Sequence, residues 1–245
     1  MSAVEPDPWA VLRNATRARV ALGRAGDALP TSRELEFRVA HAAARDAVHA
    51  PLDAGLVRRQ LAATGLDVLE VASAAPDRAT YLQRPDLGRR LAEGTVLPGG
   101  RYDLALVVAD GLSPRAVHEH AAATVTAVLD RLPGWEVAPV VVATQARVAL
   151  GDPVGEALGA AAVVVLVGER PGLSSADSLG LYLTWAPRPG RVDSERNCIS
   201  NVRPPHGLSY DQAAGTLAGL LRAARELGAS GVALKDEGAA LPPAT

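Results

Sequence analysis

A charged pair, Glu169 and Arg170, follows closely on an uninterrupted run of seven apolar residues, 161–167. The run is short and rich in valine, which is typical of a strand buried on both faces of a sheet. In open α/β sheets, ligands bind at the carboxyl ends of the strands, where loops and helix amino ends meet. A carboxylate there could accept hydrogen bonds from N–H groups of a ligand. The alternative is an exposed ion pair that only keeps a loop soluble.

Two further positions could contact the same ligand. Val148 follows the predicted strand 137–143, and Cys198 lies in the polar segment 196–203. Each has an ordinary explanation, because Val148 could pack in the core and Cys198 could be a small buried hydrophobic residue. Since Glu169 and these two residues follow or link successive strands, we expect them to meet at one edge of the sheet. A large neutral ligand fringed with amides would suit a carboxylate, a thiol and nearby backbone groups.

Several common binding and catalytic motifs are absent. The sequence has no Gly-x-x-x-x-Gly-Lys-Ser/Thr loop, no Gly-x-Gly-x-x-Gly after a predicted strand and no Gly-x-Ser-x-Gly elbow. His118 and His120 stand two residues apart on a predicted helix, where side chains point about 200° apart, so they cannot share a metal ion. His41 falls in an apolar stripe, which favours a core or interface histidine. We therefore assign no metal ligand.

Composition excludes several classes of protein. The 245-residue chain has a formal net charge of −2, which gives no global electrostatic reason to bind nucleic acid or an anionic membrane. No apolar run approaches the ~20 residues that span a bilayer, and the amino end does not resemble a signal peptide. The single cysteine excludes an internal disulfide, a zinc site built from several cysteines and an iron–sulfur cluster held by this chain alone. We expect a soluble protein of the cytoplasm.

Apolar periodicity predicts an α/β fold with a Rossmann-like, mostly parallel sheet flanked by helices, preceded by a smaller helical amino-terminal region. Strands are predicted at 66–71, 103–109, 137–143, 161–167, 179–185 and 232–234. Helices are predicted within 9–20 and at 31–48, 53–64, 84–91, 113–132, 152–158 and 209–227. We divide the chain into an amino-terminal arm with helices (1–65) and an α/β ligand-binding domain (66–245), with a disordered tail around Pro242 and Pro243.

The helix that begins at Thr31 carries two signals. Thr31 and Glu34 fit a capping box, in which a hydroxyl and a carboxylate satisfy free backbone amides. Apolar and aromatic residues from Phe37 to Val48, with His41 among them, recur at helical spacing and share one face. This face could pack in the core or dock another subunit.

Six segments, taken in this order and spacing, resemble those of a known family. They are ARVALGRAG at 18–26, HAAARDA at 41–47, YLQRPDLGRRL at 81–91, VADGLS at 108–113, VGERPGL at 167–173 and NCISN at 197–201. The set resembles the small (light) subunit of adenosylcobalamin-dependent ethanolamine ammonia-lyase. The resemblance extends over nearly the whole chain.

The resemblance implies a lyase that converts ethanolamine to acetaldehyde and ammonia by a radical reaction. It implies a hetero-oligomer in which a large TIM-barrel subunit binds the substrate and this chain closes over the cobalamin. The cobalamin contacts of the family fall on Val148, Glu169 and Cys198, and no catalytic residue falls on this chain. No histidine stands in an Asp-x-His-x-x-Gly motif, so we expect cobalamin to keep its own benzimidazole on cobalt, the base-on state.

Three points stay open at this stage. The amino end is shorter than in many relatives, whose extension is associated with packaging, so enclosure in a bacterial microcompartment is left undecided. A free-standing α/β protein could instead bind a nucleotide or metabolite through Glu169. A purely structural subunit could dock a partner through the face at 37–48.

Overall fold

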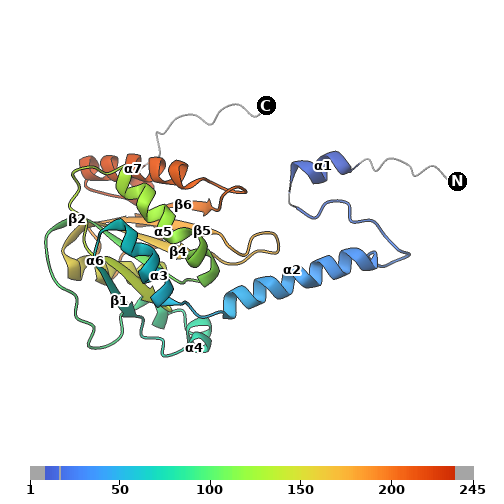
Figure 1. Ribbon diagram of the computed structural model, residues 1–245, viewed down its shortest axis with the longest axis horizontal. Coiled ribbons are helices and arrows are strands. Elements are labelled where there is room, and N and C mark those ends of the chain that lie inside the picture. Colours follow the sequence, from blue (N-terminus) through green and yellow to red (C-terminus); the bar gives the residue numbers. More distant parts are fainter. Residues whose placement is uncertain (1–8, 17, 235–245) are drawn as a thin grey trace.

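Six strands form one mixed sheet in the computed structural model, which describes residues 9–16 and 18–234 (Figure 1). In chain order they are β1 (Val68–Ala72), β2 (Tyr102–Ala109), β3 (Val140–Thr144), β4 (Ala160–Gly168), β5 (Leu179–Trp185) and β6 (Arg196–Val202). Across the sheet the order is β1-β3-β2-β4-β5-β6. The first four strands pair in parallel, whereas β5 is antiparallel to both β4 and β6. The predicted α/β class is therefore confirmed.

The reversed strand β5 makes the sheet mixed, so the predicted Rossmann-like, mostly parallel sheet is not confirmed. A parallel neighbour needs a crossover connection of about a dozen residues or more, usually through a helix. The segments 169–178 and 186–195, which join β4 to β5 and β5 to β6, contain no α-helix. The chain therefore turns back on itself twice. It forms β6 at residues 196–202, where the sequence analysis predicts no strand.

Helices cover the two faces of the sheet unequally. The α-helices are α1 (Ala10–Ala15), α2 (Thr31–His49), α3 (Ala54–Leu61), α4 (Arg78–Gln83), α5 (Pro114–Asp130), α6 (Gly151–Leu158) and α7 (Tyr210–Leu227). Short 3₁₀ helices are η1 (Ala62–Thr64), η2 (Leu87–Arg89), η3 (Val148–Leu150), η4 (Asp193–Glu195) and η5 (Gly231–Ala233). One face packs against α3, α5 and α7, and the other against α6 and η3. The hydrophobic core under α6 contains residues of β1 to β4, and Tyr182 of β5 packs at its margin. Within the described part of the chain, no residue of β6 belongs to this core.

Several helices begin or end close to their predicted bounds, where local capping signals are found. Ser113 precedes α5, and its side chain accepts a hydrogen bond from the backbone N–H of Ala116. Ser209 and Gln212 form a capping box at the start of α7. Gly228 ends α7 in the left-handed conformation that favours glycine. These local signals need no tertiary contact to act, which explains why the bounds of α5 and α7 lie close to the predicted ranges.

Two predicted elements are wrong in type. Residues 84–91 form no α-helix, because α4 ends at Gln83 and only the short η2 follows. Pro85 accounts for this, since a proline disfavours helical backbone at the residue before it. Residues 232–234 are not a strand, because η5 extends through most of this segment.

The capping box predicted at Thr31 is also wrong. The helix does begin at Thr31, but Pro30 occupies the N-cap position and no side chain caps the helix there. Thr31 is thus already inside the first turn. Glu34 instead pairs with Arg38 one turn later, at 2.6 Å.

Helix α2 projects away from the sheet and its covering helices (Figure 1). Ala47, near its carboxyl end, is the residue of this helix that is buried. Phe37 is 42% exposed and Val39 is 70% exposed. His41 stacks on Phe37 with ring centroids 6.1 Å apart, and it too is exposed. The predicted face at 37–48 is therefore largely unpacked within this chain, and a core role for His41 is wrong.

Three expectations concern the chain as a whole. The tail around Pro242 and Pro243 lies outside the described residues. The division of the chain near residue 65 stays a prediction. Among the helices described, none combines the length and the apolar character needed to cross a membrane.

Candidate functional site

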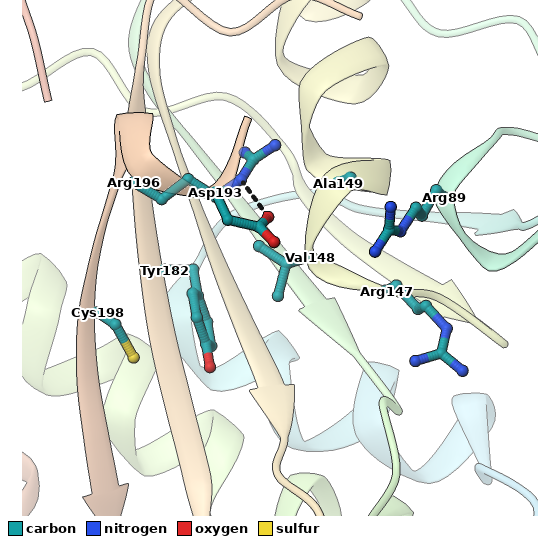
Figure 2. Close-up of a pocket in the computed structure, with 8 residues that line it drawn as sticks. All are labelled: Arg89, Arg147, Val148, Ala149, Tyr182, Asp193, Arg196 and Cys198. Carbon is teal, nitrogen blue, oxygen red and sulfur yellow. Dashed lines mark ion pairs between the residues drawn. The ribbon is translucent and has the colours of Figure 1, made fainter. Parts of the chain in front are cut away.

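Helix α6 does not cover the whole of its face of the sheet. The part of that face over β5 and β6 carries a pocket of about 280 Å³ (Figure 2). Its lining residues are Arg89, Arg147, Val148, Ala149, Tyr182, Asp193, Arg196 and Cys198. They come from η2, from η3 and the residue before it, and from β5, η4 and β6. Two of the three residues predicted to bind a ligand, Val148 and Cys198, thus lie in one pocket.

A buried carboxylate fixes the loop that carries Val148. Asp110, in the turn after β2, accepts hydrogen bonds from the backbone N–H groups of Gln145 (2.9 Å) and Ala146 (2.8 Å). It also accepts one from Nη1 of Arg78 at 2.9 Å. Burial raises the pKa of Asp110, while the two amides and Arg78 oppose that rise. One side chain after β2 therefore positions the segment that follows β3.

An arginine–tyrosine cluster adjoins the pocket through Arg147, which lines it. The guanidinium carbons of Arg78 and Arg147 lie 4.9 and 4.8 Å from the ring centroid of Tyr81. Burial, and the nearby carboxylate of Asp110, raise the pKa of Tyr81 to about 12. The Nε of Arg147 is buried and has no hydrogen-bond partner. Arg89 is exposed and lines the pocket, so its guanidinium can donate hydrogen bonds to a ligand.

Tyr182 and Cys198 stand opposite each other on β5 and β6. Figure 2 shows both side chains on the same face of the sheet. Cys198 thus lies within a strand, which corrects the prediction that it follows or links strands at the edge. Cys198 is exposed, yet partial loss of water around its sulfur raises the thiol pKa, and the charge of Glu169 adds to that rise. Partial burial likewise raises the pKa of Tyr182, so both groups are protonated near neutral pH.

The raised thiol pKa predicts slow alkylation of Cys198. The thiolate is the reactive form, and a pKa above the ordinary 9.0 leaves little thiolate at neutral pH. We expect the rate of reaction with iodoacetamide to keep rising as the pH passes 9.0. Mass spectrometry can follow the rate at one site, because the chain has a single cysteine. A rate that reaches its plateau below that pH would contradict the prediction.

A buried ion pair supports the end of the pocket formed by η4 and β6. Nη1 and Nη2 of Arg196 donate to the two carboxylate oxygens of Asp152, each at 2.7 Å. Nη1 also donates to Oγ1 of Thr184 at 2.7 Å. Nε of Arg196 lies 3.7 Å from Oδ1 of Asp193, the ion pair dashed in Figure 2. Arg196 therefore links α6, β5 and the exposed carboxylate at the pocket.

Glu169 lies directly beyond β4, next to the pocket and not among the residues that line it. Its carboxylate accepts hydrogen bonds from the hydroxyls of Ser178 and Ser200 and from the backbone N–H of Asn201 (3.3 Å). Ser200 follows Cys198 by two residues on β6, so the two side chains share the open face. The structure thus brings all three predicted residues to one side of the sheet, with Glu169 already hydrogen-bonded to the protein.

Sequence reasoning missed the other pocket residues. Tyr182 had a usable signal, since a tyrosine among the apolar residues of β5 keeps a polar tip that needs a partner or solvent. Asp193 and Arg147 carry no comparable signal, because their positions depend on how separate segments fold together.

Comparison with known proteins assigns the chain to a family. Residues 6–235 match the ethanolamine ammonia-lyase light chain family (EutC). The ethanolamine ammonia-lyase small subunit of Rhodococcus erythropolis is 52% identical over 235 residues, covering 94% of this chain and 90% of that protein. The small subunit of Azotobacter vinelandii is 55% identical over 241 residues, covering 94% and 89%. That of Ralstonia nicotianae is 54% identical over 244 residues, covering 95% and 90%. This chain therefore belongs to the ethanolamine ammonia-lyase light chain family.

Proposed function

We propose that this chain covers the cofactor of an adenosylcobalamin-dependent ethanolamine ammonia-lyase. The cobalamin would lie between the open sheet face and a large TIM-barrel subunit that binds ethanolamine. One observation carries the proposal: in a member of this family, the sheet face over β5 and β6 is uncovered and presents Val148, Tyr182 and Cys198 around one pocket. Relatives named as small subunits support a large partner.

The size and chemistry of this face fit one side of a corrin ring. A pocket of about 280 Å³ is too small for a whole cobalamin, so a second protein surface must complete the site. Val148 and the ring of Tyr182 offer apolar contact to a flat ring. The exposed guanidinium of Arg89, which lines the pocket, offers donors to amide oxygens at the ring's rim. Glu169 offers an acceptor for their N–H groups.

The residues of this chain bind and orient the cofactor. Adenosylcobalamin, when bound, supplies the radical that starts the conversion of ethanolamine to acetaldehyde and ammonia. Val148 and Tyr182 exclude water from the covered side of the site. Cys198 permits a close approach because its thiol is small and protonated near neutral pH. We assign no catalytic residue to this chain, since the substrate site lies mainly on the large subunit.

Replacing Glu169 with alanine tests the proposal. In the complex with the large subunit, we expect the dissociation constant for cobalamin to rise by ~10-fold or more. The physical reason is the loss of a hydrogen bond to a charged group, worth roughly 1.5–3 kcal/mol. Equilibrium dialysis with cobalamin measures the change.

Matched variants separate cofactor binding from loop support. Ser178→Ala removes one internal hydrogen bond to the Glu169 carboxylate and keeps its charge, so we expect near-normal cofactor affinity. Glu169→Gln keeps the length of the side chain and removes the charge, so we expect intermediate affinity. If Glu169→Ala lowers stability while cobalamin affinity stays unchanged, the carboxylate only supports its loop.

The lower axial ligand of cobalt gives a separate prediction. No histidine is found among the residues that line the pocket, and none stands in an Asp-x-His-x-x-Gly motif. We therefore expect cobalamin to remain base-on. Electron spin resonance of the Co(II) state, with ¹⁵N-labelled protein, should show superhyperfine splitting from benzimidazole nitrogen that labelling leaves unchanged. A change in the splitting on labelling would reveal a protein nitrogen and contradict base-on binding.

A further inference from the structure

A second group of polar side chains lies on the α5 side of the sheet, away from the pocket. It consists of Glu119 and His120 of α5 and Asp177 of the loop before β5. Each can offer one ligand atom, and these atoms lie within 4.8 Å of one another. An imidazole nitrogen with two carboxylate oxygens is a donor set that suits a divalent transition metal ion.

The orientation of His120 is fixed from the side away from the carboxylates. The residue is 6% exposed. Its Nδ1 lies 3.0 Å from the hydroxyl oxygen of Tyr210. Its Nε2 is buried with no hydrogen-bond partner, and it lies 3.9 Å from Oε2 of Glu119. A buried ring nitrogen without a hydrogen bond is costly, so this atom indicates a ligand. Histidines that bind metals usually engage a partner through the other ring nitrogen, as Tyr210 does here.

Arginines hold both carboxylates in place. Nε of Arg115 donates to Oε1 of Glu119 at 2.7 Å, which leaves Oε2 on the side of the imidazole. Nη1 of Arg203 donates to Oδ1 of Asp177 at 3.2 Å. The positive charges of the two arginines also weaken the attraction of these carboxylates for a cation. The side chain of Glu119 is 40% exposed and that of Asp177 is 21% exposed, so an ion can enter from solvent.

We propose that Glu119, His120 and Asp177 bind a Zn²⁺ ion, with water completing its coordination. The imidazole disfavours Mg²⁺ and Ca²⁺, which take oxygen ligands. The ion would join α5 to the loop before β5. That loop also carries Ser178, whose hydroxyl donates to Glu169. An ion bound there would steady the segment that carries Ser178.

Zinc binding to the full-length chain tests the proposal. After removal of metal with a chelator, equilibrium dialysis against ZnSO₄ should show one saturable site per chain. Zn²⁺ should also raise the thermal unfolding midpoint, because a ligand that binds the folded state stabilises it. Glu119→Gln and Asp177→Asn should each weaken binding by ~10-fold or more, and Tyr210→Phe by ~10-fold. These three substitutions keep the size of the side chain, so the fold should survive them.

His206→Ala is the matched control, because His206 is exposed and lies outside the cluster. We expect this variant to bind Zn²⁺ as the unaltered chain does. The proposal is overturned if the unaltered chain shows no saturable site. It is equally overturned if Glu119→Gln and Asp177→Asn bind Zn²⁺ normally, or if His206→Ala abolishes binding.

Discussion

Replacing Asp152 with alanine is expected to lower the free energy of unfolding by about 3–5 kcal/mol, because it leaves a buried guanidinium without its buried counter-charge. The side chains of Arg196 and Asp152 are 3% and 2% exposed. Both carboxylate oxygens accept hydrogen bonds from Arg196, at 2.7 Å each. Without them, Arg196 keeps the uncharged acceptors Oγ1 of Thr184 and the carbonyl of Arg191. Its remaining ion pair is the longer one with Asp193, at 3.7 Å, whose side chain is 91% exposed and so screened by water. Urea unfolding followed by circular dichroism measures the loss.

Two other variants show whether burial is the cause. Asp152→Asn keeps the shape of the side chain and one acceptor oxygen, so its loss of stability should be smaller. Asp86→Ala breaks an ion pair with Arg84, whose side chains are 60% and 51% exposed, and should leave the unfolding midpoint nearly unchanged. Equal shifts for Asp152→Ala and Asp86→Ala would contradict the argument from burial.

The strands that pack on both faces are the part of the fold most readily predicted from sequence. In β4, residues 162–168 are all buried, so the apolar run needs no knowledge of its neighbours to be recognised. Buried β2 behaves in the same way. Caps such as Ser113 and Ser209 are equally local. These signals do not give the direction in which a strand runs, because β5 would be equally apolar if it were parallel to β4.

Strand β6 escaped prediction because it lies at an edge with one face open. Its burial alternates irregularly, and exposed Cys198 and Ser200 flank buried Ile199. Pairing with β5 gives this polar segment its extended form. The open face of β6 weakens the apolar pattern in the sequence, which is why the strand was not predicted. The same open face is the one that can bind a ligand.

The candidate site was predictable from the sequence only in part. Val148 and Cys198 do meet in one pocket, but the meeting place is a sheet face and not a row of strand ends. Glu169 differs most from expectation, because Ser178 and Ser200 already donate to it. Such contacts join segments that the sequence alone does not place together. They orient the carboxylate before any ligand binds.

Placing charges on α2 is expected to disrupt association with the large subunit. Leu35 and Val39 lie one turn apart, at 56% and 70% exposure, on a helix that projects from the rest of the chain (Figure 1). Apolar residues so exposed on a projecting helix indicate a surface that another chain covers. Burying two such side chains contributes about 3 kcal/mol or more. The double variant Leu35→Glu/Val39→Glu should therefore weaken the complex at least ~100-fold, as measured by analytical ultracentrifugation.

The fold of the double variant should be unchanged, because neither side chain is buried in this chain. Circular dichroism and the thermal midpoint of the isolated chain check this point. Val96→Glu is the control for charge at an exposed apolar residue, since Val96 is 88% exposed and lies outside α2. It should leave association unaltered. If the double variant assembles with normal affinity, α2 does not dock the large subunit. Its exposed apolar residues then contact a different chain or solvent.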